Sequence, residues 1–269
     1  MTDTYTQQMT TLVRQAVDGY RAKHPDWPHG PVRAALIDMD GTLYDSMPLH
    51  ATAWKRLADE LGLKTERDEF FMFEGMTGAA TLRVLFDRAY GHHPSDEEIA
   101  ELYHRKTLYF NEMVGMVENG HIVEGRTPTT PVMPGAREMV ATLRRLGVDT
   151  VLVTGSGQLS LLERLNEVYD NAFPADKRVT SHDVHHGKPD PEPYLLGLQK
   201  AGVEPWQAIV IENAPLGVES GARAGIFTIA VTTGPIPATA MADAGADLIL
   251  PSMPELAPIL PQLLTALNS

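Results

Sequence analysis

The sequence predicts an α/β fold, in which a Rossmann-like doubly wound parallel sheet forms the core and a small all-helical cap is inserted after the first strand. Short, nearly continuous apolar segments alternate with helical segments through most of the chain, which is typical of parallel strands covered by helices on both faces. Residues 46–113 lack any comparable β-branched run. With 269 residues, 43% of them hydrophobic, the chain is long enough for such a core and a smaller second domain.

Residues 1–29 are predicted to form an N-terminal helical extension. Apolar residues recur at helical spacing from Leu12 to Tyr20, and the proline-rich segment 24–31 ends this helix and serves as a linker. The first strand of the core then covers residues 32–37.

Residues 46–132 are predicted to be the helical cap together with a linker, rich in glycine and proline, that returns to the core. Apolar residues at helical spacing within 49–89 indicate its first helices. A further helix is expected over residues 95–113, because Ser95 and Glu98 have the spacing of a capping box.

Residues 30–45 and 133–269 are predicted to form the core. After the first strand, the expected strands are 148–154, 207–212, 226–231 and 247–250. The expected helices are 158–169, 216–224 and one that ends at 241–245.

Composition excludes several classes of function. The 22 Lys and Arg residues against 35 Asp and Glu give a net charge of −13, which disfavours nucleic acid as a partner because phosphate backbones need a basic face. The absence of cysteine excludes disulfides, thiolate nucleophiles and cysteine-ligated metals. Because the chain has neither an apolar stretch that could span a membrane nor an apolar signal core, we expect no membrane partner and a cytoplasmic location. We also expect a monomer.

Polar residues follow several of the predicted strands, where a parallel sheet gathers its ligands. They are Asp38 and Asp40 after the first strand, Thr154 followed by Gly155 and Ser156, Lys188 in the next connection, and Glu212 with Asn213. Three carboxylates in one place repel one another unless a cation is present, and oxygen ligands without His or Cys favour Mg²⁺. Mg²⁺ and one lysine would together attract a phosphate, so the sequence predicts a small phosphorylated substrate.

These residues, in this order, resemble the four motifs of the haloacid dehalogenase (HAD) superfamily. Residues 38–42, Asp-Met-Asp-Gly-Thr, look like the first motif, Thr154 like the second, Lys188 like the third and Glu212-Asn213 like the fourth. The resemblance covers about residues 32–255, and the helical segment lies where this family inserts its small cap domain.

The resemblance implies a role for each residue. Asp38 is the expected nucleophile that forms an aspartyl-phosphate, and Asp40 is the expected acid and base for the leaving group and the attacking water. Thr154 and Lys188 would bind and neutralise the phosphoryl oxygens, with Gly155 and Ser156 beside them. The Mg²⁺ ligands, direct or through water, would be Asp38, the Asp40 carbonyl, Glu212 and Asn213.

Structural roles for the same residues stay open. Asp38 and Asp40 could cap a turn after a buried strand, and Thr154 could be an N-cap or turn residue. Lys188 could be a solvated lysine beside a proline turn. Glu212 and Asn213 could cap the helix that follows them.

The fourth motif departs from the family, which usually has an acid where this chain has Asn213. An amide oxygen can bind Mg²⁺ but brings no charge, so we expect Glu74, in the cap, to supply it. Residues 73–78, Phe-Glu-Gly-Met-Thr-Gly, stand where β-phosphoglucomutases have Leu-Lys-Gly-x-Ser-Arg, so both basic residues of that motif are replaced. His50, four residues before Trp54, still resembles the first cap helix of that subfamily and is an expected substrate-binding residue.

The favoured prediction is a Mg²⁺-dependent phosphohydrolase that acts on inorganic pyrophosphate or another small phosphate compound. Glu-Gly-x-Thr-Gly in the cap, together with residues 153–158 and 211–217, looks like the HAD-type inorganic pyrophosphatases. A sugar-phosphate phosphatase or a β-phosphoglucomutase is the alternative, and a non-catalytic phosphate-binding protein is a remote one. The loop histidines His182, His185 and His186 are expected to be solvated, and Phe70, Phe71 and Phe73 to be packing residues of the cap.

Overall fold

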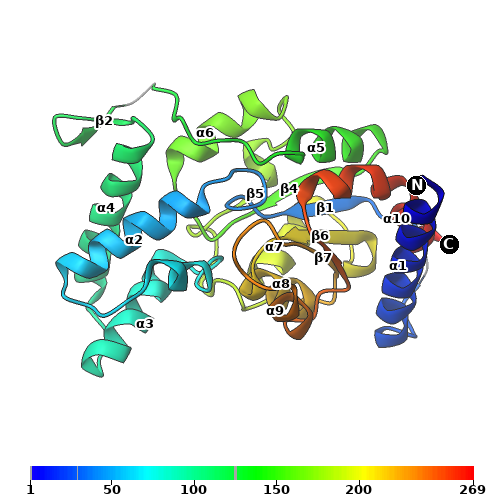
Figure 1. Ribbon diagram of the computed structural model, residues 1–269, viewed down its shortest axis with the longest axis horizontal. Helices are drawn as coiled ribbons and strands as arrows, with labels where there is room; N and C mark the ends of the chain where they lie inside the picture. Colours follow the sequence, from blue (N-terminus) through cyan, green and yellow to red (C-terminus); the bar gives the residue numbers. More distant parts are fainter. Residues whose placement is uncertain (1, 29, 124–125) are drawn as a thin grey trace.

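Six parallel strands form the centre of the core lobe in the computed structural model, which describes residues 2–28, 30–123 and 126–269 (Figure 1). The predicted extension and return linker therefore each include positions outside the described residues, namely 1, 29 and 124–125. The strand order is β5-β4-β1-β6-β7-β8, which is the doubly wound arrangement that the sequence predicts. The strands are β1 Ala34–Ile37, β4 Asp149–Val153, β5 Arg178–Val179, β6 Ala208–Glu212, β7 Phe227–Val231 and β8 Leu248–Leu250.

Helices cover both faces of this sheet (Figure 1). On one face lie α5 Ala136–Arg145, α6 Leu159–Val168 and α10 Leu256–Asn268. On the other lie α7 Glu192–Ala201, α8 Pro215–Arg223 and α9 Ala238–Asp243. The alternation of side chains in β1 explains this. Ala35 and Ile37 point to the face covered by α5, α6 and α10, while Ala34 and Leu36 point to the opposite face and pack with α7. Short 3₁₀ turns complete the core at Ala175–Lys177, Pro205–Gln207 and Met253–Glu255.

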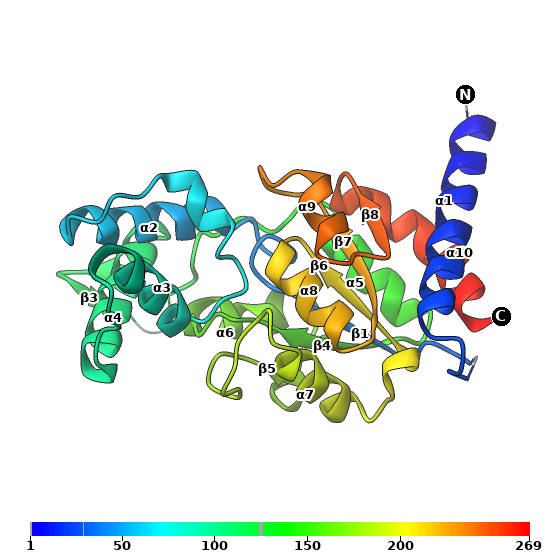
Figure 2. The ribbon, with the colours of Figure 1, turned by 90° about the horizontal axis from the view of Figure 1, so that it is seen from below.

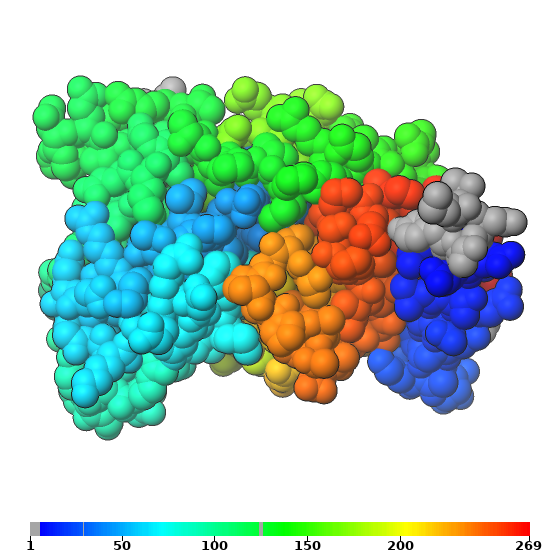
Figure 3. Space-filling model, in the orientation of Figure 1, coloured from blue at the N-terminus to red at the C-terminus, as the bar shows by residue number. Residues whose placement is uncertain are grey.

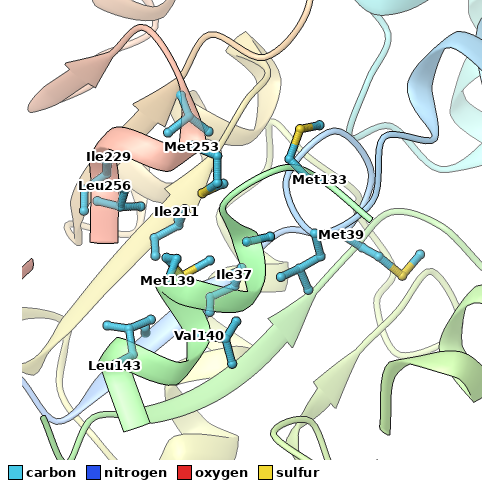
Figure 4. Packing of buried hydrophobic residues seen from close by; sticks show 14 of the residues in the cluster. Ile37, Met39, Met133, Met139, Val140, Leu143, Ile211, Ile229, Met253 and Leu256 are labelled. Atoms are coloured by element: carbon cyan, nitrogen blue, oxygen red, sulfur yellow. The ribbon is translucent and has the colours of Figure 1, made fainter. Parts of the chain in front are cut away.

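The larger apolar layer holds α5 and α10 against the sheet. Figure 4 shows Ile37 and Ile211 of the strands facing Met139 and Leu143 of α5, and each of these side chains is 0% exposed. Burying one such side chain contributes about 1.5–3 kcal/mol. This layer makes the strand positions rigid and therefore fixes the loops at the strand ends.

The N-terminal helix α1 Thr2–Lys23 packs along α10, at the end of the core far from the cap (Figure 2). Val13 and Val17 are buried in the apolar layer, and the Tyr20 hydroxyl donates to the Gly225 carbonyl at 2.9 Å. Lys23 pairs with Asp247 at 2.8 Å. The extension therefore supports the core and lies remote from the strand ends that carry the predicted site.

The cap lobe lies between β1 and α5 in the sequence and beside the strand ends in space (Figure 2). Its helices are α2 Met47–Glu60, α3 Gly78–Tyr90 and α4 Asp96–Met113, with a 3₁₀ turn at Arg67–Phe71. The predicted capping box of Ser95 and Glu98 is present at the start of α4. Apolar residues of the cap pack on Val218 of α8 and Met241 of α9, so the lobes share one apolar cluster, and Figure 3 shows them in contact.

The segment predicted as return linker contains regular structure that the sequence does not predict. A two-stranded antiparallel hairpin, β2 Val117–Glu118 with β3 His121–Ile122, lies within the segment predicted as linker. Its turn residues Asn119 and Gly120 have φ of 51° and 79°, and Asn-Gly is the dipeptide that favours such a turn. The strand β5 is a second element that the sequence does not predict, because two residues are too short for a periodic pattern. The helix after Lys188 begins only at Glu192.

Candidate active site

The carboxyl ends of three neighbouring strands bring the predicted residues together. In the register of the sheet, Ile37 of β1 pairs with Leu152 of β4 on one side and with Ile211 of β6 on the other. Asp38, Thr154 and Glu212 therefore leave the sheet at nearly the same level, and each is at most 3% exposed. These are the positions at which a parallel sheet binds its ligands.

Lys188 lies between two of the predicted carboxylates. Its Nζ donates to Asp38 Oδ1 and Glu212 Oε1, both at 2.6 Å, and to the Val153 carbonyl at 3.0 Å. Burial by itself lowers the pKa of Lys188, but the adjacent Asp38 and Glu212 carboxylates outweigh burial and raise it. The lysine is therefore a permanent buried cation, which rules out the solvated lysine considered from the sequence.

Glu212 has no acceptor position to spare. Its Oε1 accepts from Lys188 and, at 2.9 Å, from the Tyr194 hydroxyl. Its Oε2 accepts from the backbone N–H groups of Asn213 and Ala214, at 2.9 and 3.3 Å, just before α8 begins. A carboxylate has about four acceptor positions. Glu212 thus orients Lys188 and caps the following backbone, and a contact with a metal, direct or through water, would have to displace one of these four donors.

Asp38 keeps one oxygen free. Its Oδ2 is buried without a hydrogen-bond partner, although Oδ1 is held by Lys188. Burial raises the pKa of Asp38 to about 8, against the lowering effect of Lys188 and with a further increase from Glu212 and Asp40. A buried acceptor without a partner is costly, so its presence here points to a ligand at that oxygen.

Asp40 is held by a chain of buried polar side chains from the cap. Its Oδ1 accepts from the Ser46 hydroxyl at 2.5 Å and contacts His50 Nε2 at 3.0 Å, while His50 Nδ1 lies 2.6 Å from Lys106 Nζ. Burial opposes ionisation of Asp40, but the charge and hydrogen bond of His50, with the bond from Ser46 and the charge of Lys106, lower its pKa. When Lys106 is protonated it can only donate to Nδ1, which leaves the His50 proton on Nε2, from which His50 donates to Asp40.

The two nitrogen bases of this chain hold their protons weakly. Burial and the neighbouring Lys106 lower the pKa of His50, and burial lowers the pKa of Lys106 to about 7. The Lys106 ammonium also lies over the Trp54 and Phe110 rings, at 5.2 and 5.5 Å from their centres. His50 is thus a partner of Asp40, and its ring is stacked on Phe110 at 4.3 Å between ring centres.

Glu74 reaches from the cap to the fourth motif. Its Oε1 accepts from Asn213 Nδ2 at 2.7 Å, while Asn213 Oδ1 accepts from the Thr42 hydroxyl at 3.0 Å. Glu74 is only 6% exposed, so it is not a solvated loop residue. A Cβ on Gly41 would lie 1.9 Å from Asn213 Nδ2, and Gly41 has φ of 81°, which explains the glycine of the first motif.

The donor set fits a hard divalent cation. Burial raises the pKa of Glu74 well above its usual range, and the nearby Asp38 carboxylate adds to this. Within the described residues, no three His, Cys, Asp or Glu side chains are preassembled as a metal site. The predicted ligands differ from such a group, because they include the Asp40 backbone carbonyl and the Asn213 amide. A cation beside the unpartnered Asp38 oxygen would relieve the repulsion between Asp38 and Glu74.

A cavity of about 60 Å³ lies between the lobes next to these residues. Asp38, Asp40, Thr154, Gly155 and Ser156 line its core side. On the cap side the lining residues include His50, Glu74, Lys106, Met76 and four aromatic residues, Trp54, Phe70, Phe73 and Tyr103. The predicted packing role of the cap phenylalanines is confirmed, since Phe70 and Phe71 belong to the apolar cluster of the cap and Phe73 packs against it. Phe70 and Phe73 also line the cavity.

Thr154 has a structural role beside its predicted one. Its hydroxyl accepts from the Ser156 backbone N–H at 3.0 Å, and the Ser156 hydroxyl accepts from the Gln158 N–H at 3.2 Å. These bonds shape the turn that leads into α6, so the turn role and a place at the cavity coexist. The loop histidines His182, His185 and His186 are exposed, as predicted, and none of them lines the cavity.

Three residues of the site are not predicted by the sequence. They are Lys106 on the cap helix α4, Ser46 just before α2, and Tyr194 on α7. Only the tertiary fold brings them into contact with His50, Asp40 and Glu212, respectively. Their sequence neighbourhoods carry no motif that separates them from ordinary helix residues. A lysine on the apolar stripe of a helix is the one available signal, because lysine is rarely buried unless it is paired.

Comparison with known proteins agrees with the four motifs. The sequence profile of the haloacid dehalogenase-like hydrolases matches residues 32–225. Hexitol phosphatase A of Escherichia coli (strain K12) is 31% identical over 221 residues, which are 82% of this chain and 91% of that protein. Validoxylamine A 7'-phosphate phosphatase of Streptomyces hygroscopicus subsp. limoneus is 31% identical over 225 residues, 83% of this chain and 95% of that one.

A solved structure has the same fold along nearly the whole chain. It is a Bacteroides vulgatus protein provisionally called a β-phosphoglucomutase, with 40% identity and a TM-score of 0.86 over 97% of this chain and 100% of that one. The described residues contain no helix that is long and apolar enough to cross a membrane.

Proposed function

Because the chain belongs to the haloacid dehalogenase-like hydrolases and is an enzyme of that family, we propose that it is a Mg²⁺-dependent phosphatase that hydrolyses small phosphorylated carbohydrates through an aspartyl-phosphate. One observation carries the proposal. Asp38 has one oxygen held by Lys188 and the other buried, unpartnered and beside the cavity. That is the arrangement a carboxylate nucleophile needs before substrate binds.

The reaction has two steps. Asp38 Oδ2 attacks phosphorus, the bond from phosphorus to the leaving oxygen breaks, and that oxygen takes a proton from Asp40. Water then attacks the phosphorus of the aspartyl-phosphate and gives its proton to Asp40, which releases inorganic phosphate and regenerates Asp38. The negative charge of the arriving phosphate raises the pKa of Asp40, which allows it to carry the first proton.

The remaining residues orient and neutralise. Lys188 balances the phosphoryl charge, and Ser46 and His50 hold Asp40 in place. Mg²⁺ would be held by Asp38, the Asp40 carbonyl, Asn213 and Glu74, and Glu212 would reach it through water only by giving up one of its present donors. When bound, it supplies positive charge to the phosphoryl oxygens. The closed cap excludes bulk water from this buried site.

The substrate class follows from the cavity and the relatives. Hexitol phosphatase A and the phosphorylated carbohydrates phosphatase of Thermotoga maritima act, by their names, on phosphorylated carbohydrates. Aromatic rings such as Trp54 and Tyr103 can stack on the C–H face of a sugar or polyol. Among the described lining residues, Lys106 is the one cation of the cap, and it is bound to His50. A second phosphate would thus lack a free basic partner, which disfavours a mutase.

Pyrophosphate remains a second candidate because of one observation. Glu74 enters the site from the cap and, with the aromatic residues, leaves a cavity of about 60 Å³. So small a space suits a compact leaving group. The names of the relatives support a carbohydrate phosphate, so we place pyrophosphate second.

A substrate panel tests the proposal. Initial rates with MgCl₂ would be measured for hexitol and hexose phosphates, glycerol phosphate and pyrophosphate, and glucose 1-phosphate would be assayed for isomerisation. We expect the highest kcat/KM for a carbohydrate phosphate and none for the Asp38→Asn variant. A kcat/KM for pyrophosphate that is far above all carbohydrate phosphates would overturn the substrate class, and isomerisation would overturn the hydrolase.

A further inference from the structure

One short loop of the cap, residues 73–78, reaches down to the core beside the site, and we call it the cap loop. It approaches core glycines at two points, with its backbone at Gly155 and with the Thr77 side chain at Gly187. A Cβ on Gly155 would lie 2.4 Å from the Gly75 carbonyl oxygen and 3.0 Å from the Met76 oxygen, and a Cβ on Gly187 would lie 2.9 Å from the Thr77 methyl carbon. The cap loop therefore rests on core backbone that carries no side chains.

Gly155 needs to be glycine because of this contact. Its φ is not in the left-handed region, so alanine is compatible with the backbone conformation. The neighbouring atom is a backbone oxygen, which cannot rotate away as a flexible side chain can. An alanine at position 155 would push the cap loop outward by roughly 1 Å before ordinary van der Waals contact returned.

Such a displacement acts directly on the site. Gly75 follows Glu74, whose carboxylate accepts from Asn213 at 2.7 Å, and a shift of this size would break that hydrogen bond. Gly75 also packs on the Lys188 side chain, since a Cβ there would lie 3.0 Å from Lys188 Cδ. The depth to which the cap loop descends thus decides both the position of Glu74 and the size of the cavity.

We propose that Gly155 is a specificity-determining residue that sets how far the cap closes and thereby restricts the enzyme to compact substrates. Gly187 has the same role at a second contact, where it lies against Thr77 of the cap loop. The inference rests on the proposed phosphatase function, and it goes beyond it by assigning size selection to a core glycine. Its role is steric, and it donates no group to the reaction.

The test compares Gly155→Ala and Gly187→Ala with Gly19→Ala as the matched control. Gly19 lies in α1 without a left-handed φ, and a Cβ there would meet no atom within 4 Å, so this variant should behave as wild type. The ratio of kcat/KM for glycerol phosphate to that for a hexitol phosphate should fall at least 10-fold in Gly155→Ala. An unchanged ratio in a folded variant would overturn the proposal.

A second readout does not depend on the substrate. The chain has no cysteine, so Val84→Cys on the cap and Leu195→Cys on the core give two unique, exposed label sites. With MgCl₂ and orthovanadate, spin-label distances should lengthen in Gly155→Ala and Gly187→Ala but not in Gly19→Ala. If no carbohydrate phosphate is hydrolysed, the proposed substrate class fails, but the distances still test the contact of the cap loop with Gly155 and Gly187. Longer distances in the variants support the role of this contact, and an unchanged distance distribution overturns it.

Discussion

Replacing Asp38 by asparagine should abolish turnover and also make the folded protein more stable. The variant keeps the size of the side chain but cannot form an aspartyl-phosphate, so we expect kcat to fall by at least about 10⁴-fold. The gain in stability comes from the environment of Asp38, which is 3% exposed and has one unpartnered oxygen. A site built for a nucleophile costs stability, and removing the carboxyl should return part of it.

The magnitude follows from the pKa of Asp38. Burial raises it from the ordinary 3.8 to about 8, so the folded protein holds a proton that the unfolded chain releases. At pH 7.5 this difference corresponds to roughly 5 kcal/mol, at about 1.36 kcal/mol per pH unit. The amide oxygen of the variant can still accept from Lys188, but its buried N–H groups would lie where Asp38 Oδ2 has no partner, which takes back about 1–3 kcal/mol. The net gain at pH 7.5 without Mg²⁺ should therefore be about 2–4 kcal/mol.

The sign of the pH dependence provides the sharper test. A folded pKa above the unfolded value gives stability that is complete below the unfolded pKa and is lost as pH rises through the folded one. Wild type should therefore lose stability between about pH 4 and pH 8 relative to Asp38→Asn. The variant's advantage should be present at about pH 7.5 and absent at about pH 4.5. At the lower pH the raised pKa costs the wild type only about 1 kcal/mol, which is no more than the cost of the unpartnered amide in the variant.

Urea unfolding followed by tryptophan fluorescence, at both pH values without added metal, measures this difference. The comparison cancels the contribution of titrating groups far from the site, whereas Glu74, whose pKa the Asp38 carboxylate raises, changes together with Asp38. Added MgCl₂ should stabilise wild type more than the variant, because the proposed metal site loses a ligand in Asp38→Asn. An Asp38→Asn protein that turns over substrate, or that is no more stable than wild type at pH 7.5, would refute the reasoning.

Three further predictions concern the cap and the fourth motif. Glu74→Gln should weaken Mg²⁺ binding in calorimetry about 10- to 100-fold while the exposed control Glu97→Gln leaves it unchanged, and equal affinities would remove Glu74 from the ligand set. Asn213→Asp restores the usual acid of the family and should tighten Mg²⁺ binding about 10-fold in the same titration, whereas weaker binding would contradict a direct contact with the metal. Burial lowers the pKa of Lys106 from 10.5 to about 7, so between these pH values the unfolded chain binds more protons than the folded protein, and the free energy of unfolding should rise with pH. Lys106→Met should remove this rise when urea unfolding is compared at about pH 6.5 and 9.5. A rise that persists in the variant would show that another group causes it.

Much of the core could be predicted because its signals are local. The strand that ends before Asp38 is a run of buried apolar residues. The acidic motif that follows it places Asp38, the proposed nucleophile, at the end of β1 without any knowledge of the rest of the chain. The capping box of α4 is likewise a property of neighbouring residues. The hairpin at Asn119-Gly120 has an equally local signal, which the surrounding glycines and prolines obscure.

The sequence by itself determined the doubly wound core, the order of the strands' acidic and basic residues and the charge deficit left by Asn213. Only the tertiary structure decided which residues meet. It placed Lys106 on His50, filled the acceptor positions of Glu212 with Tyr194 and backbone N–H groups, and carried Glu74 from the cap to Asn213. The physical reason is separation along the chain: Glu74 and Asn213 are 139 residues apart. Their contact depends on how the two lobes close, which no local pattern encodes.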